Sequence, residues 1–168
     1  MKTIKRDYNY YLFCFFFTSI LCWILEMIYS LLFRNKFVLP GSFYGPYCPI
    51  YGSTFVLLLL VFKRKDNILI NGLKIFFSVT ISEYLISYIT EKKFHKIIWS
   101  YRKFPLNLNG RVCLPMSLVF TIMGIITLYF LEPHLRKLYL KLNNKIDTFT
   151  IILLILFIID VVYTLSIT

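Results

Sequence analysis

Two long and nearly uninterrupted apolar runs constrain the fold of this chain more than any other feature. They extend from Tyr10 to Phe33 and from Phe149 to Ile167. A helix that crosses a bilayer needs roughly 20 mostly apolar residues, whereas a soluble protein would expose such runs as large apolar patches. Because backbone in the bilayer core must satisfy its own hydrogen bonds, the spanning segments are expected to be helical. The sequence predicts an all-α, polytopic helical membrane bundle.

Five segments are apolar enough to be predicted as transmembrane helices, near residues 8–33, 47–62, 68–90, 113–132 and 149–167. The second segment is expected to be short, tilted or re-entrant, because Pro49 lies at its start and only Ser53 to Phe62 is cleanly apolar. The first segment follows basic residues but is too long for a signal peptide and lacks a small-residue cleavage site, so it is expected to be retained. With no internal repeat, a single helical transmembrane domain over residues 1–168 is predicted.

The basic residues point to a membrane partner rather than to nucleic acid. The chain is 58% hydrophobic and carries a net charge of +11, with its lysines and arginines in short clusters between apolar runs. Contact with membrane lipids explains this distribution better than nucleic-acid binding, which is not expected. With the N-terminus inside, ten lysines and arginines fall on the cytoplasmic side and eight on the other. This excess predicts a multi-pass protein of the cell membrane with a cytoplasmic N-terminus.

Three carboxylates, those of Glu26, Glu83 and Asp160, interrupt the apolar segments. Each lies about seven residues before the end of its segment, roughly 10 Å below the membrane surface at 1.5 Å per residue. The odd-numbered segments end on the same side, so the three acids are predicted to lie in one layer. A charge at membrane depth is costly, which makes these acids functional candidates. The alternative is structural pairing, for example of Glu83 with Arg111.

The connection 34–46 leads into a segment that mixes turn formers, aromatic residues and a thiol, Gly45-Pro46-Tyr47-Cys48-Pro49-Ile50-Tyr51-Gly52. Its two prolines and two glycines predict irregular backbone. At membrane depth, irregular backbone occurs where it is buried in protein or lines a polar cavity. Tyr47, Cys48 and Tyr51 are therefore candidate cavity residues. The alternative is a tight turn that enters a helix, with the tyrosines as interfacial anchors.

The connection 91–112 interleaves apolar and basic residues, as in an interfacial loop with Trp99, Phe94 and Phe104 directed inward. Near its end lies Arg111, which is predicted to enter the fourth helix. An arginine has five fixed donors and is a natural partner for a buried carboxylate.

Metal, nucleotide and cofactor sites are not indicated. No Cys-x-x-Cys is present, and His95 and His134 are expected on opposite sides of the membrane, so no zinc site is predicted. The sequence contains no G-x-x-x-x-G-K-[ST], so ATP is not expected to bind in the P-loop manner, and no cofactor is predicted. Cys48 and Cys113 fall on the same side, where they form either a disulfide or two free buried thiols.

Several of these motifs together resemble a known bacterial family. They are Glu26, the Gly45 to Gly52 segment, Glu83-Tyr84 followed by Glu91, Trp99 and Tyr101, Pro105 with Asn107, and Asn109-Gly110-Arg111-Val112-Cys113-Leu114. The family is named “Putative ABC-transporter type IV”, also called CmpB-like permeases. The resemblance covers about residues 15 to 162 and includes Asp160 as a C-terminal aspartate. The chain departs from the family at Trp99-Ser100-Tyr101, where Trp-Asp-Tyr is usual, and in the loop before Gly45.

The resemblance implies membrane residence and a permease role, with a separate ATP-binding subunit or a homo-oligomer as partner. Enzymatic activity is not favoured. Two alternatives remain, an intramembrane enzyme that acts on a lipid or lipid-linked substrate and a non-catalytic assembly subunit. The predicted binding or cavity residues are Glu26, Tyr47, Cys48, Tyr51, Glu83, Glu91, Trp99, Tyr101, Asn107, Arg111 and Asp160.

Overall fold

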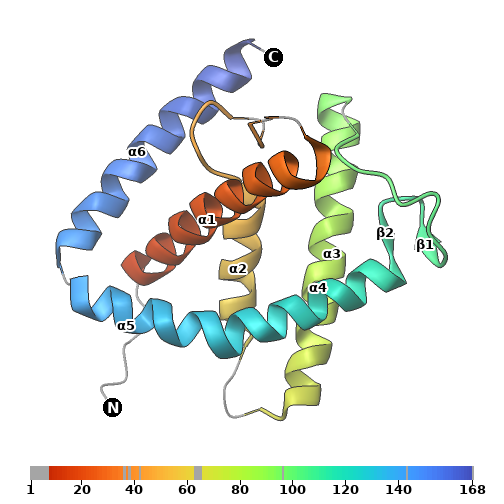
Figure 1. Ribbon diagram of the computed structural model, residues 1–168, viewed down its shortest axis with the longest axis horizontal. Coiled ribbons are helices and arrows are strands. Elements are labelled where there is room, and N and C mark those ends of the chain that lie inside the picture. The colour runs from red at the N-terminus through yellow and green to blue at the C-terminus, as the bar shows by residue number, and fades with distance from the viewer. Residues whose placement is uncertain are drawn as a thin grey trace. The chain divides into compact units, whose positions relative to one another are not determined.

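The computed structural model of the chain describes residues 8–35, 37, 39–41, 43–62, 66–95, 97–142 and 144–167. Apart from two short strands, its regular elements are helical (Figure 1). In chain order they are α1 (Tyr8–Arg34), α2 (Pro49–Val61), α3 (Ile68–Phe94), β1 (Asn107–Leu108), β2 (Val112–Cys113), α4 (Leu114–Ile126), the π-helical turn η1 (Thr127–Leu131), α5 (Glu132–Leu142) and α6 (Asn144–Ile167).

The predicted all-α membrane architecture is confirmed. Four helical stretches in the described residues are long and apolar enough to cross a bilayer, namely Tyr8–Leu32, Ile68–Lys93, Leu114–Leu142 and Ile146–Ile167. The second predicted segment corresponds to α2, which has only 13 residues. A helix of that length spans about 20 Å, less than the roughly 30 Å hydrocarbon core, which fits the expectation of a short segment.

The fourth predicted segment extends further than its hydropathy indicates. Instead of ending near residue 132, the helix continues through η1 and α5 to Leu142. Pro133 lies just after the π-helical turn. A proline ring clashes with the carbonyl one turn earlier in an α-helix, and the wider turn of η1 relieves this clash, so that the helix continues.

Several residues on which the predicted orientations depend lie outside the described residues. This applies to Lys2, Lys5, Arg6, Lys36, Lys63, Arg64, Lys65 and Lys96, and to the side chains of Arg34, Phe94 and Lys145. The inward orientation of Phe94 and the cytoplasmic N-terminus therefore stay predictions.

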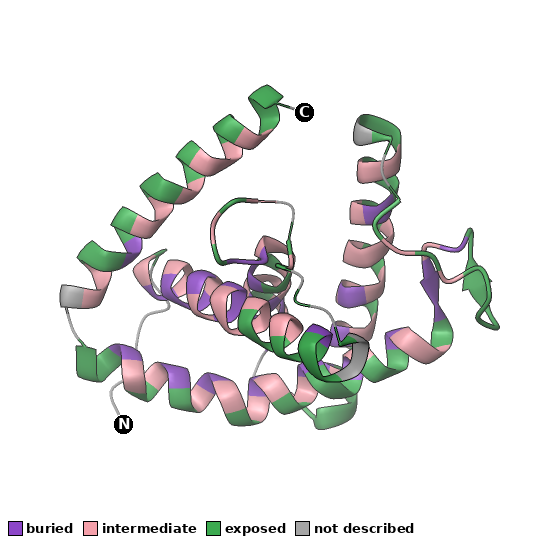
Figure 2. Cartoon of the chain, turned by 45° about the horizontal axis from the view of Figure 1, so that its top comes forward, coloured by how far each residue is buried: buried purple, intermediate pink, exposed green. Residues whose placement is uncertain are grey.

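The chain divides into two compact units. Unit 1 comprises Met1–Val56 and His134–Thr168, and unit 2 comprises Leu57–Pro133. In unit 1, α1 packs against α6 through aromatic rings; Phe15 and Phe157 are 5.7 Å apart between centroids and meet edge to face. Most turns of α6 carry exposed residues (Figure 2), and in a bilayer these apolar side chains contact lipid.

The packing of α2 on α1 depends on Gly52. A Cβ atom at this position would collide with the carbonyl oxygen of Phe15 and with the hydroxyl of Ser19. The absence of a side chain lets the two backbones approach closely, as small residues do between membrane helices.

In unit 2, α3 packs against α4 at a second close approach. A Cβ atom at Gly124 would lie 2.7 Å from Cγ2 of Ile75 and 3.3 Å from Cδ1 of Leu58. One turn earlier in α3, the buried Asn71 donates a hydrogen bond to the hydroxyl of Tyr129 at 3.3 Å. The strands β1 and β2 lie beside α3 (Figure 1), between the end of that helix and the start of α4.

Candidate functional site

The larger group of predicted site residues lies in unit 2, on one face of α3. Glu83, Ser87 and Glu91 follow one another at intervals of four residues, and Tyr84 and Tyr88 lie next to them. Residues four apart share a face of an α-helix. The segment that follows α3 folds back over this face and supplies the partners of these side chains.

A tight hairpin turn positions Arg111. β1 and β2 pair antiparallel, with Leu108 opposite Val112. Asn109 and Gly110 have φ values of 55° and 71°, and the N–H of Arg111 donates to the carbonyl of Leu108 at 3.0 Å. Positive φ at both central residues is typical of a type I′ turn, for which Asn-Gly is a preferred pair. Arg111 therefore follows the turn directly and does not enter α4, which begins at Leu114.

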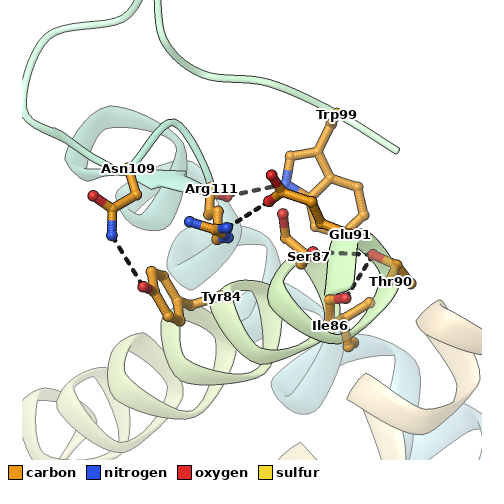
Figure 3. Close-up of polar contacts among 8 residues, drawn as sticks. All are labelled: Tyr84, Ile86, Ser87, Thr90, Glu91, Trp99, Asn109 and Arg111. Carbon is orange, nitrogen blue, oxygen red and sulfur yellow. Dashed lines mark hydrogen bonds and ion pairs between the residues drawn. The ribbon is translucent and has the colours of Figure 1, made fainter. Parts of the chain in front are cut away.

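The guanidinium of Arg111 is fixed against α3. It forms an ion pair with Glu91 (Figure 3). Its central carbon also lies 5.6 Å and 5.4 Å from the ring centroids of Tyr84 and Tyr88. A planar guanidinium combines a carboxylate partner with contact to aromatic faces better than an ammonium does. The Arg111 side chain is 16% exposed, so this ion pair is only partly screened by solvent.

Two further contacts fix the hairpin, one within the connection and one to α3. The indole N–H of Trp99 donates to the carbonyl of Arg111 at 3.0 Å, and the amide of Asn109 donates to the hydroxyl of Tyr84 at 3.1 Å (Figure 3). Asn107 shapes the turn, because its side-chain oxygen accepts the N–H of Gly110 at 3.0 Å. Trp99 and Asn107 thus fix the backbone of the turn that positions Arg111.

Glu83 has a different partner from the one its charge suggests. The hydroxyl of Tyr101 donates to Oε1 of Glu83 at 2.7 Å, whereas Oε2 is buried and has no hydrogen-bond partner among the described residues. The pairing of Glu83 with Arg111, considered from the sequence, is not found there, because Arg111 pairs two turns further along α3. The pKa of Tyr101 is raised, first by burial and then by its hydrogen bond to Glu83 and the charge of that carboxylate.

The second group of predicted site residues lies in unit 1, around the irregular segment before α2. The hydroxyl of Tyr51 donates to Glu26, and Sγ of Cys48 lies 3.7 Å from Oε2 of the same carboxylate. Burial, followed by the charge of Glu26 and this contact, raises the pKa of Cys48 to about 12. Cys48 lies in unit 1 and Cys113 in unit 2, and each is a buried free thiol.

Asp160 of α6 accepts hydrogen bonds from the same irregular segment. Its carboxylate accepts the backbone N–H groups of Tyr44 and Gly45 at 3.1 Å and 2.8 Å, and the hydroxyl of Tyr47 also donates to it. The N–H of Cys48 donates to the carbonyl of Ser19 at 3.1 Å. The backbone is irregular over residues 45–48 only, whereas Pro49 to Gly52 form the first turn of α2, where a proline is well tolerated. The prediction of irregular backbone up to Gly52 was therefore wrong for its second half, which fits the alternative of a turn that enters a helix.

The predicted site residues thus fall into two groups within separate units, and their common depth stays a prediction. Sequence reasoning missed Tyr88, and it quoted Tyr84 and Asn109 as motif residues without predicting them as members of the cluster on α3. The four-residue spacing of Tyr84 and Tyr88, next to the spacing of the acids, was the available signal.

Comparison with known proteins identifies the family. The family described as “Putative ABC-transporter type IV” matches residues 13–165. The chain belongs to this family. The match includes both groups of candidate residues, from Glu26 to Asp160, and agrees with the resemblance seen in the sequence motifs. No curated protein and no solved structure matched the chain. Membership in the ABC-transporter type IV family and the four long apolar helices identify a multi-pass membrane protein.

Proposed function

We propose that this chain is a permease-type membrane subunit of an ATP-binding-cassette transport system. In this proposal, the polar cluster on α3 binds a polar solute that carries a positive group. Membership in the ABC-transporter type IV family and the four candidate spans support the membrane role. The sequence contains no P-loop, so ATP hydrolysis is assigned to a separate chain.

We place the solute at Oε2 of Glu83, because this oxygen has no hydrogen-bond partner among the described residues. A buried carboxylate oxygen without a donor is costly, and ionisable residues within membrane segments usually mark a pathway or a binding site. Arg111 pairs with Glu91 through one terminal nitrogen and contacts two tyrosine rings, while its buried Nε has no partner among the described residues, so it does not neutralise Glu83. An ammonium group on the solute supplies both the missing charge and the missing donors.

The charge of the cluster favours the same type of ligand. The carboxylates of Glu83 and Glu91 and the guanidinium of Arg111 carry a net charge of −1 when all three are ionised. A singly charged cationic group brings the cluster to neutrality, which lowers the cost of keeping it at membrane depth. Tyr101 has the role of a positioning residue, since it holds Oε1. Because Oε2 is buried, the solute reaches it only when the side chains that cover it move.

Reconstituted transport tests this function. The tagged full chain is isolated from its native membrane, any ATP-binding-cassette chain that co-purifies is identified, and the complex is placed in liposomes. Uptake from a mixture of amino acids, amines, polyamines and sugars is then measured by mass spectrometry with and without ATP. We expect ATP-dependent uptake of an amine-bearing solute and a loss of at least about tenfold in Glu83→Gln, corresponding to about 1.4 kcal/mol.

A matched acid–tyrosine pair outside the cluster supplies the control. The hydroxyl of Tyr139 donates to Asp147 at 2.8 Å in unit 1, as that of Tyr101 donates to Glu83. Asp147→Asn should leave uptake unchanged. The proposal fails if no ATP-binding-cassette chain co-purifies, or if Glu83→Gln folds normally and transports as the unchanged chain does.

A further inference from the structure

The segment between α3 and α4 has a second face that the polar cluster does not use. On one side Tyr101 and Arg111 bond to α3. On the other side Phe104, Leu106 and Leu108 are 45%, 73% and 58% exposed. We call these three side chains the apolar strip. The ring of Phe104 meets that of Tyr101 edge to face at 5.9 Å, yet all three side chains stay exposed within five positions of the sequence. Exposed apolar side chains gathered in this way often mark an interaction site.

The apolar strip is held in place by the backbone beneath it. The N–H of Tyr101 donates to the carbonyl of Gly110 at 2.7 Å, and the N–H of Leu114 donates to the carbonyl of Leu106 at 3.2 Å. Leu106 has a φ of 52°, in the left-handed region that a leucine rarely adopts. Strain of this kind persists where the surrounding structure determines it, often at functional positions. The exposed leucine is thus a fixed feature of the hairpin.

Two basic residues border the apolar strip. Arg102 and Lys103 are exposed and directly precede Phe104, and residues 97–110 contain no aspartate or glutamate. Gly110 gives the stem of Arg102 room to lie against the turn, because a Cβ atom at Gly110 would lie 2.5 Å from Cγ of Arg102. Exposed apolar side chains next to cations are typical of segments that lie in an anionic membrane surface.

The connected helices limit where this segment can lie. α3 ends at Phe94 and α4 begins at Leu114, and both belong to stretches long enough to cross a bilayer. The segment between two such helices starts and ends at the same membrane surface. We propose that the apolar strip inserts at the boundary between headgroups and acyl chains of an anionic leaflet, with Arg102 and Lys103 bound to lipid phosphates. This inference goes beyond the proposed function and stands whether or not the chain transports a solute.

Depth-dependent quenching in reconstituted membranes tests the insertion. The full chain with Leu106→Cys, labelled with an environment-sensitive fluorophore, is placed in bilayers of phosphatidylcholine and phosphatidylglycerol that contain acyl-brominated lipid. The matched control is Ser100→Cys, an exposed polar position in the same connection. We expect the Leu106 label to be quenched about twofold more than the Ser100 label, and to be reduced more slowly by aqueous dithionite. Leu108→Cys repeats the measurement if the first variant does not fold.

The basic pair is tested by the lipid that the chain retains. Native mass spectrometry measures phosphatidylglycerol bound to the purified chain and to Arg102→Gln and Lys103→Gln. Each substitution should lower the retained phosphatidylglycerol about fivefold. Equal quenching at positions 106 and 100 overturns the proposal, whether both labels are open to dithionite or both are covered by protein. Retention of phosphatidylglycerol that does not change in the variants overturns the role of the basic pair.

Discussion

The substitution Glu83→Gln should stabilise the folded chain, although it removes a hydrogen-bonded acid. Glutamine keeps an oxygen that accepts the hydroxyl of Tyr101, now at 2.7 Å from Oε1 of Glu83. It replaces the buried Oε2, which has no partner among the described residues, with an uncharged amide. Binding sites often carry such unfavourable groups, so that removing them raises stability while it lowers function.

The size of this effect follows from the burial of one oxygen. A buried unsatisfied polar group costs about 1–3 kcal/mol, and more when it is charged. The amide nitrogen of glutamine also lacks a partner, and Glu83 as a whole is only half-buried, so we expect a net gain of about 1 kcal/mol. In a protein of this size that gain corresponds to an increase of about 2–4 °C in Tm.

Thermal unfolding of the purified chain in detergent measures the change, with Tyr101→Phe as the second arm. When Tyr101→Phe is the only substitution, it leaves Oε1 of Glu83 without its donor and should lower the free energy of unfolding by about 1–2 kcal/mol. The loss should be smaller in the background of Glu83→Gln, because a neutral acceptor loses less than a charged one. A fall of several degrees in Glu83→Gln itself would refute the reasoning and make Glu83 a structural residue.

Three further predictions concern unit 1. Asp160→Asn places an amide where backbone N–H groups now donate, and should lower Tm by several degrees, about 2 kcal/mol, in the same unfolding assay; an unchanged Tm would contradict this. Gly52→Ala should destabilise by about 1–3 kcal/mol because its Cβ meets α1, whereas Gly72→Ala, whose Cβ would lie 3.7 Å from its nearest neighbour, should be neutral or stabilising. Equal effects of the two alanines would refute the close approach. At pH 8 Cys48, with a pKa of about 12, should react with maleimide about a thousandfold more slowly than an ordinary thiol, followed by mass spectrometry of its peptide. Glu26→Gln should accelerate the reaction, since it removes a charge that disfavours the thiolate, and rapid labelling of the unchanged chain would count against the buried site.

Local sequence signals predicted the elements well and their contacts poorly. Apolar length located the spans, and the prolines and glycines of residues 45–52 located the start of the irregular segment, because both depend on the residues themselves. They did not show that the helix already begins at Pro49. The end of the fourth span was missed because hydropathy falls at Glu132 while the helix continues past Pro133 through a π-helical turn. Hydropathy reports the surroundings of a helix and does not report where its backbone hydrogen bonds end.

The partners of the predicted site residues depend on tertiary geometry. Charge alone favoured Glu83 as the partner of Arg111, whereas the hairpin turn brings that arginine to Glu91. The Asn109-Gly110 pair was a local signal for that turn, but the strands on either side have only two residues each, so apolar alternation could not reveal them. Similarly, the hydrogen bonds of Asp160 cross more than 110 positions of sequence, which no local pattern encodes.

Ligand-induced stabilisation shows whether Oε2 of Glu83 receives a cationic group. The Tm of the purified full chain is measured with increasing concentrations of amino acids, primary amines, quaternary amines and sugars, and the same series is repeated on Glu83→Gln. A ligand present at 100 times its Kd stabilises by about 2.7 kcal/mol, or roughly 5–10 °C here. We expect an amine-bearing solute to produce this increase in the unchanged chain and not in Glu83→Gln. An equal increase in both proteins, or stabilisation by uncharged sugars alone, would contradict this expectation.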